Sequence, residues 1–120
     1  MRPSTIPPSW EDQTSLSKLA PPPRSGAAFA YDGAPGAGYD VLFGGESLGG
    51  FYNDTWIDVN GSWSNVTSTA CATVCPPSLA YAAMAYDPAV PAIVLMGGLI
   101  GCPGNGCGEG QPKRNLRNRE

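Results

Sequence analysis

The residues best suited to chemistry in this chain are four cysteines, Cys71, Cys75, Cys102 and Cys107. An even number of cysteines in a chain without histidine favours disulfide bonds, and the spacing leaves both local pairs and crosslinks between the two pairs open. A zinc ion bound by four thiolates is the sharper alternative, because intervals of three and four residues permit it. Reduced, unpaired thiols are the third interpretation.

The absence of histidine limits the catalysis that the chain can support. It removes the usual general base, the commonest metal ligand and any Ser-His-Asp or Cys-His arrangement within the 120 residues. Acidic pairs such as Glu11 with Asp12, and Asp54 with Asp58, are expected to be surface charges. The glycines of residues 44–50 lack the Gly-Lys-Ser/Thr ending of a phosphate-binding loop. We therefore expect a protein that is not an enzyme and that holds no cofactor or metal.

Three asparagines, Asn53, Asn60 and Asn65, match the acceptor pattern for N-linked glycosylation. The same residue types also suit hairpin turns and outer strands, so the pattern has a purely structural alternative. Together with paired cysteines it favours an extracellular or cell-surface protein. Residues 1–8 lack the apolar stretch of a secretory signal, so we expect no signal peptide in this chain, which we interpret as a fragment of a longer protein.

Composition and charge narrow the fold class and the partners. Fewer than a fifth of the 120 residues are Leu, Ile, Val or Phe, while 16 are Gly and 13 are Pro, and the formal net charge is only -3. This combination favours one small, turn-rich all-β domain over a disordered chain. The body of the chain is acidic and only residues 113–120 are basic, so we expect no nucleic-acid binding. Prolines and Asp87 interrupt the most apolar region, residues 79–100, so we expect no membrane span.

An internal repeat organises the chain. Residues 27–32 (AAFAYD) recur as 82–87 (AAMAYD), and residues 41–45 (VLFGG) recur as 94–98 (VLMGG), so nine of eleven positions are identical. Each copy follows a group of prolines, and a tryptophan precedes each of those groups. The copies are 53 to 55 residues apart, so the chain holds about two units of one period.

Each period predicts four short strands, which in the first period are residues 25–31, 39–43, 53–59 and 62–67. A segment of Gly, Pro and Ala separates the first two strands, which we expect to pair. Asn60-Gly61 is the dipeptide that supplies the two positive φ angles of a two-residue hairpin, and it places Trp56 and Trp63 on adjacent strands. The alanine-rich first strand suits a position where neighbouring sheets converge and only small side chains pack.

The order of these motifs resembles the kelch repeats, whose units are the four-stranded blades of a β-propeller. The matching features are the apolar run 41–43, then Gly-Gly, then two aromatic residues with six residues between them. The family usually has Tyr where this chain has Trp56. The second copy keeps its apolar run and Gly-Gly, after which no aromatic residue follows. The resemblance implies that Gly44, Gly45, Gly97, Gly98, Trp56 and Trp63 are structural residues of blades.

The resemblance also implies an all-β partial propeller, with one complete four-stranded blade and parts of two neighbours. Residues 1–19 are expected to hold the end of a preceding blade, with an outer strand around Trp10, and a link. Residues 20–68 are expected to form the complete blade, and residues 69–101 a link and the inner half of the next blade. Residues 102–120 are expected to form a divergent Gly/Cys loop and a basic, disordered tail. Because closed propellers have at least about four blades, further blades of the same longer protein or self-association must complete the array.

The resemblance points to a non-enzymatic interaction module that presents loops to a protein or glycan partner. Exposed aromatic and arginine side chains in loops supply much of the energy of such contacts. The candidate binding residues, on the face that carries the links between blades and the loop after Gly-Gly, are Arg24, Glu46, Leu48, Phe51 and Tyr52. The alternative is an accessory or truncated part of a carbohydrate-active or galactose-oxidase-like enzyme. Its catalytic residues would lie outside this chain, because a copper oxidase of that kind needs histidine ligands.

Overall fold

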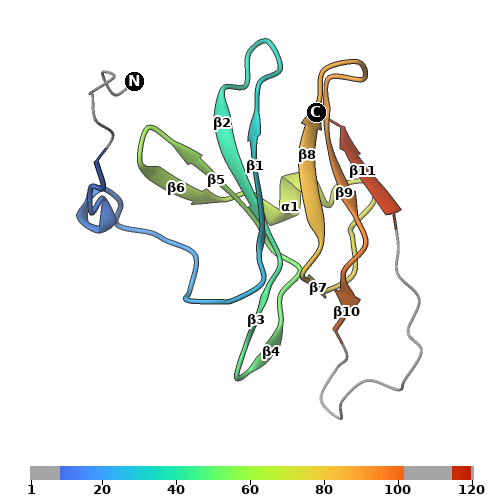
Figure 1. Ribbon diagram of the computed structural model, residues 1–120, viewed down its shortest axis with the longest axis horizontal. Helices are drawn as coiled ribbons and strands as arrows, with labels where there is room; N and C mark the ends of the chain where they lie inside the picture. Colours follow the sequence, from blue (N-terminus) through green and yellow to red (C-terminus); the bar gives the residue numbers. More distant parts are fainter. Residues whose placement is uncertain (1–8, 102–114, 120) are drawn as a thin grey trace.

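The computed structural model of the chain describes residues 9–101 and 115–119 (Figure 1). In chain order the elements are η1 (Thr14–Leu16), β1 (Ala28–Asp32), β2 (Tyr39–Phe43), β3 (Glu46–Ser47), β4 (Gly50–Phe51), β5 (Thr55–Val59), β6 (Ser62–Asn65), α1 (Thr67–Ala70), β7 (Leu79–Ala80), β8 (Ala83–Asp87), β9 (Ala92–Met96), β10 (Leu99–Ile100) and β11 (Asn115–Arg119). All strand pairs are antiparallel. The all-β fold class is therefore confirmed.

The first sheet has four strands in the order β1-β2-β5-β6. These strands lie within three residues, at either end, of the four that the sequence predicts. Asn60 and Gly61 have φ angles of 53° and 88° and connect β5 to β6, which confirms the predicted hairpin. Trp56 and Trp63 accordingly lie on adjacent strands.

The second sheet repeats the register of the first. Ala30 lies opposite Val41 in the β1–β2 hairpin, and the equivalent Ala85 lies opposite Val94 in the β8–β9 hairpin. We call residues 24–46 unit 1 and residues 79–99 unit 2. The bridge between Ser25 and Glu46 in unit 1 recurs as the pairing of Ala80 with Leu99 in unit 2, so the two units share a pattern that extends beyond the identical residues.

The backbone angles of the two units also agree. Gly44 and Gly97 have φ angles of 71° and 76°, and Gly45 and Gly98 have 104° and 90°. Even Tyr81 follows the pattern, with a φ of 63° against 69° at the equivalent Gly26. A positive φ is sterically unfavourable for tyrosine but not for glycine. Tyr81 therefore adopts the backbone conformation of the repeat against the preference of its own residue type.

The third strand of the second sheet is β11, which pairs with β9 in the register that β5 takes on β2. The prediction of a disordered tail is therefore wrong for residues 115–119. That prediction weighed the side-chain charges of the tail, whereas an open sheet edge offers backbone N–H and C=O groups to any extended segment within reach. The rest of the expected Gly/Cys loop and tail, residues 102–114 and 120, lies outside the described residues.

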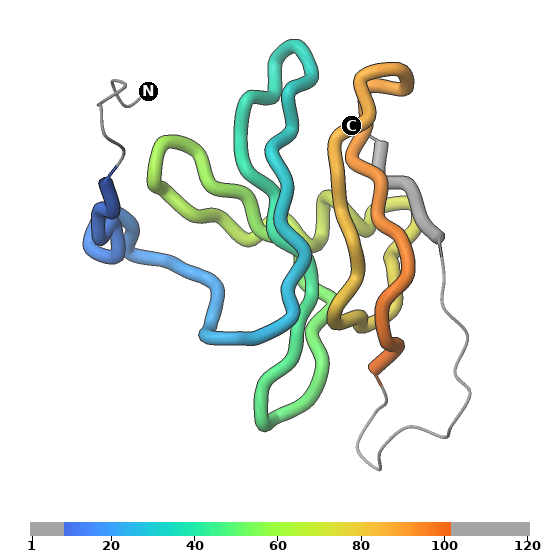
Figure 2. Tube along the Cα trace, viewed as in Figure 1, coloured from blue at the N-terminus to red at the C-terminus, as the bar shows by residue number. Residues whose placement is uncertain are grey.

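The two sheets lie side by side with β1 next to β8, as Figures 1 and 2 show. A buried cluster joins Ala28 and Phe43 of unit 1 to Leu79 and Leu95 of unit 2. The small side chains of Ala28 and Ala30 on β1 allow this close approach of the two first strands. The core of the molecule is thus the contact between the two units.

The N-terminal segment does not form the strand expected around Trp10. Residues 9–13 contain no regular structure, and the Trp10 side chain is fully exposed. A strand needs a neighbouring strand to satisfy its backbone groups, and no strand within residues 14–101 and 115–119 forms a sheet with this segment. A local likeness to the later link persists, because the Asp12 carboxylate accepts hydrogen bonds from Thr14 in the way that the Asn65 amide oxygen accepts them from Thr67.

The helical content of residues 9–101 and 115–119 amounts to η1 and the four-residue α1. No helix in these ranges has the length and apolar character needed to cross a bilayer.

Candidate functional site

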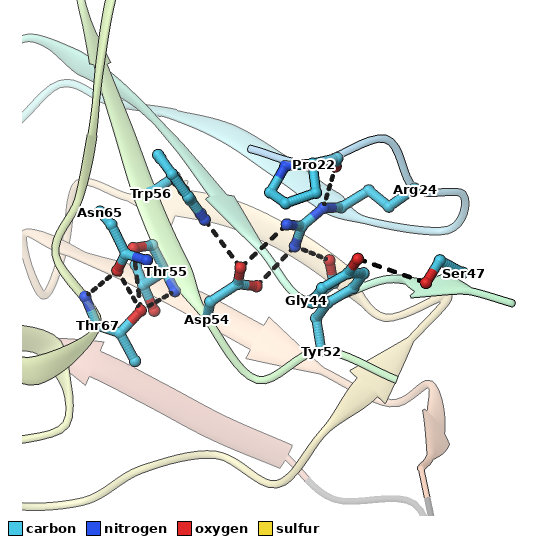
Figure 3. A network of polar contacts seen from close by, with 10 residues as sticks. All are labelled: Pro22, Arg24, Gly44, Ser47, Tyr52, Asp54, Thr55, Trp56, Asn65 and Thr67. Atoms are coloured by element: carbon cyan, nitrogen blue, oxygen red, sulfur yellow. Dashed lines mark hydrogen bonds and ion pairs between the residues drawn. The ribbon is translucent and has the colours of Figure 1, made fainter. Parts of the chain in front are cut away.

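The predicted binding residues gather at the end of unit 1 that carries the β3–β4 hairpin, and Arg24 lies at their base. Its guanidinium donates two hydrogen bonds to the Asp54 carboxylate, at 2.6 and 3.0 Å, in a bidentate pair (Figure 3). It also donates to the carbonyl oxygens of Gly44, at 2.9 Å, and Pro22, at 3.1 Å. The side chains of Arg24 and Asp54 are only 4% and 18% exposed, so this ion pair lies inside the fold.

Two aromatic side chains complete this polar network. The Tyr52 ring centroid lies 3.8 Å from the central carbon of the Arg24 guanidinium, a cation–π contact. The Trp56 indole N–H donates to Asp54 at 2.8 Å. Burial by itself would raise the pKa of Asp54, but the hydrogen bonds from Arg24 and Trp56 and the charge of Arg24 outweigh it and hold that pKa below its ordinary value.

The β3–β4 hairpin projects from this base. Leu48, at its turn, is fully exposed at 109%. Phe51 lies directly against Gly101, and Glu46 accepts a hydrogen bond from the Tyr81 hydroxyl of unit 2. The Tyr52 hydroxyl, 3.4 Å from the Ser47 hydroxyl, ties the hairpin back to the Arg24 network. The five predicted residues therefore lie in one region, and Leu48 is the one whose side chain is free of the fold.

Two residues of this region were missed by sequence reasoning. Asp54 was expected to be a surface charge, but it is the partner of a buried arginine. Tyr81 was assigned no role, although it contacts both Glu46 and the backbone of Gly26. The repeat offered a signal for Tyr81, because it stands 55 residues after Gly26 and at the equivalent position. No comparable signal marks Asp54.

The residues expected to be structural have well-defined places. A Cβ at Gly44 would overlap the carbonyl oxygen of Leu79, so a side chain there would separate the two units. A Cβ at Gly97, the equivalent position, would have no described atom within 4 Å. Trp56 is 6% exposed, and Trp63 is half-buried with its ring centroid 6.4 Å from that of Phe29.

The link after α1 contains a disulfide bond between Cys71 and Cys75. This is one of the local pairings that the sequence left open, and it removes both thiolates from the alternative zinc site. Cys102 and Cys107 lie outside the described residues. No group of three or more His, Cys, Asp or Glu side chains that could hold a metal occurs within residues 9–101.

The three candidate glycosylation sites are exposed on the same sheet. Asn53 precedes β5, Asn60 occupies the β5–β6 turn and Asn65 ends β6. The side-chain oxygen of Asn65 already accepts hydrogen bonds from the backbone and hydroxyl of Thr67. Glycosylation of these residues stays a prediction.

A second feature of the first sheet is a pair of facing carboxylates. Asp40 on β2 lies opposite Asp58 on β5, and both line a cavity of about 530 Å³ together with Tyr31 and Asn60. Burial, and then the negative charge of Asp58, raise the pKa of Asp40. Like charges in directly opposite positions destabilise a sheet, so this pair costs folding free energy at neutral pH.

No protein-family model matches this chain, and no curated protein matches its sequence.

Proposed function

We propose that this chain is a non-enzymatic interaction module, part of a kelch-type propeller of a secreted or cell-surface protein, and that its β3–β4 hairpin binds a protein partner. The observation that carries the proposal is Leu48, a fully exposed leucine at the turn of a hairpin. A large aliphatic side chain in that position gains about 1.5 to 3 kcal/mol when a partner covers it.

Three contacts fix the base of the hairpin, and this order supports the proposal. The ion pair of Arg24 with Asp54, the ring of Tyr52 on Arg24 and the hydrogen bond from Tyr81 to Glu46 each fix a different part of it. A loop that is already ordered pays less entropy on binding. These contacts also change the predicted roles, because Arg24 and Tyr52 act as the support and Leu48 as the contact.

A protein partner suits this tip better than a glycan. Sugars stack on exposed aromatic faces, and the Tyr52 ring is occupied by Arg24. The kelch assignment is supported by the four-stranded order β1-β2-β5-β6 and by the paired glycines that end β2 and β9. The disulfide and the exposed asparagines support an oxidising, extracellular setting.

The test compares capture of extracellular and surface proteins by the tagged chain and by two variants. Leu48→Asp places a charge at the tip, and Leu19→Asp makes the same change at a leucine that is 61% exposed in the N-terminal link. We expect a protein enriched by the parent chain and by the Leu19 variant to be captured at least tenfold less by the Leu48 variant, with all three chains equally stable. Equal capture by both variants would overturn the proposal, as would binding to a glycan array alone.

The alternative, an accessory part of a carbohydrate-active or galactose-oxidase-like enzyme, has one observation in its favour. The cavity beside Asp40 and Asp58 is also lined by Tyr31, and carboxylates next to an aromatic residue suit the hydroxyls and faces of sugars. This alternative predicts oligosaccharide binding that Tyr31→Ala removes and Leu48→Asp leaves unchanged, measured by chemical-shift titration. The reverse pattern would exclude it.

A further inference from the structure

Each unit turns one face of its hairpin toward the other unit. The inward residues of unit 1, by register and burial, are Ala28, Ala30, Val41 and Phe43. The inward residues of unit 2 are Met84, Tyr86, Ile93 and Leu95. These two sets do not correspond in the repeat. For example, Ala28 of unit 1 points inward, whereas its equivalent in unit 2, Ala83, points outward. The face of unit 1 that meets unit 2 is therefore not the equivalent of the face of unit 2 that meets unit 1. The contact between the two units is head to tail.

The two outer faces repeat the same chemistry. The outer face of unit 2 carries Ala83, Ala85, Val94 and Met96, the equivalents of the inward residues of unit 1. The outer face of unit 1 carries Phe29, Tyr31, Asp40 and Leu42, the equivalents of the inward residues of unit 2. Five of these eight positions have the same residue as the buried contact. Phe29 and Tyr31 are 55% and 59% exposed, and Met96 is 51% exposed.

We infer that a second copy of this chain docks head to tail on the first, with the outer face of its unit 1 on the outer face of unit 2. The inference goes beyond the proposed function and does not depend on it. The occupant follows from the repeat, because the two outer faces carry the equivalents of two faces that already pack against each other. The outer face of unit 1 is partly covered by its own chain, since the Phe29 ring centroid lies 6.4 Å from that of Trp63 and Leu42 lines a cavity with Pro21 and Pro22. A head-to-tail contact leaves one free face at each end, so assembly continues until a ring closes or a filament forms.

Backbone groups between the units support the same geometry. The N–H of Gly45 donates to the carbonyl of Leu79, and the N–H of Tyr81 donates to the carbonyl of Gly26, both at 2.8 Å. At the outer face of unit 2 the equivalent groups are the N–H of Gly98 and the carbonyl of Tyr81. Gly97 keeps the positive φ of Gly44, and no described atom lies within 4 Å of its Cβ position, where Gly44 meets the Leu79 carbonyl. The carbonyl of Arg24 in a second copy would lie there.

Side chains at the rim of the contact are compatible with the second copy. Between the existing units, the Tyr81 ring lies against Gly26 and its hydroxyl bonds to Glu46. In the docked pair, Gly26 of the second copy would occupy the place of Tyr81 and would face Leu99, the equivalent of Glu46. Leu99 is 54% exposed and carries no polar group that would be left unpaired by this exchange.

One position opposes the docking. Asp40 on the outer face of unit 1 stands where unit 2 has Ile93, which is 1% exposed in the existing contact. Desolvating this carboxylate beside Asp58 would weaken the contact at neutral pH. Asp40→Ile restores the residue of the buried contact and should strengthen association at least tenfold.

The test is sedimentation of the full chain over a range of concentrations, alone and in mixtures. Ala85→Arg blocks the outer face of unit 2, and Phe29→Arg blocks that of unit 1. We expect the parent chain and Asp40→Ile to show mass that rises with concentration, and each arginine variant to remain monomeric. An equimolar mixture of the two arginine variants should form a one-to-one dimer and nothing larger, because each supplies the face that the other lacks.

Three results would overturn the inference. A parent chain and an Asp40→Ile chain that both stay monomeric at millimolar concentration would show that the outer faces do not associate. A mixture of the two arginine variants that stays monomeric would exclude the head-to-tail pairing. Loss of association in Phe29→Arg but not in Ala85→Arg would show that like faces pair symmetrically. Thermal unfolding of each variant confirms that it is folded.

Discussion

Units 1 and 2 have the same backbone conformation, but the side chains at equivalent buried positions differ in polarity. Arg24 in unit 1 stands where unit 2 has Leu79, and both side chains are almost fully buried. Leu79 joins the apolar cluster, whereas Arg24 needs the carboxylate of Asp54 and two backbone carbonyls to be tolerated there. The repeat therefore determines where a side chain lies, while partners outside the repeat determine whether that side chain can be charged.

The largest expected effect comes from breaking the ion pair of unit 1. Asp54→Asn keeps one acceptor but leaves the Arg24 guanidinium buried without a counter-charge, and we expect it to lower the free energy of unfolding by about 3 kcal/mol. Chemical denaturation measures the change. Because the pKa of Asp54 is lowered in the fold, the stability it contributes is present above its unfolded pKa of 3.8 and is lost as the pH falls through the folded value.

The matched control makes unit 1 resemble unit 2. Arg24→Leu combined with Asp54→Asn removes both charges and places a leucine where Leu79 stands in the other unit, so it should recover most of the lost stability. If the double variant were as unstable as Asp54→Asn alone, the polarity of this position would not be the cause.

We expect a smaller difference in stability between alanine variants of Gly44 and of its equivalent Gly97. Gly44→Ala and Gly97→Ala both place a side chain at positive φ, which costs about 1 kcal/mol. Only the first also drives a Cβ into the Leu79 carbonyl. We expect Gly44→Ala to be the more destabilising by about 2 kcal/mol in thermal or chemical unfolding. Equal costs would mean that unit 2 does not approach unit 1 at this glycine.

The smallest expected change in stability is at Asp40, the position of unit 1 that is equivalent to Ile93 of unit 2. Asp40→Asn should raise the free energy of unfolding at pH 7 by about 0.5 kcal/mol, because it removes a like-charge pair across two strands. The pKa of Asp40 is raised in the fold, so protonation favours the folded state. The advantage of the variant should therefore shrink as the pH falls from above the folded pKa toward 3.8. Asp58→Asn should give a similar gain at pH 7, and an advantage that is constant with pH would contradict this account.

Sequence reasoning succeeded where local chemistry dictates local structure. Asn60-Gly61 specifies a hairpin turn by its φ angles alone, and the duplicated strands carry their own pairing partners within 15 residues. It failed where an outcome depends on distant parts of the chain. The burial of Arg24 depends on a carboxylate 30 residues away, and β11 depends on an open edge of β9. The positive φ of Tyr81 could be inferred only from its equivalence to Gly26, because tyrosine by itself disfavours that angle.

The candidate site shows the same division. The grouping of Glu46, Leu48 and Tyr52 followed from the predicted loop after Gly-Gly, and the structure places them together. Which of their side chains is exposed could not be predicted, because that depends on contacts made from unit 2 and from the link before unit 1. The exposure of Leu48 is a property of the assembled fold.

A backbone NMR study of the chain in solution would show directly whether the two units share one register and stack head to tail. Two units in one register, stacked head to tail, predict cross-strand nuclear Overhauser effects between Ala30 and Val41 and between Ala85 and Val94. They also predict contacts from the Tyr81 amide proton to Gly26, with slow exchange of that amide. A different register in the second hairpin, or no contact between Tyr81 and Gly26, would show that the two units are not stacked copies of one structure.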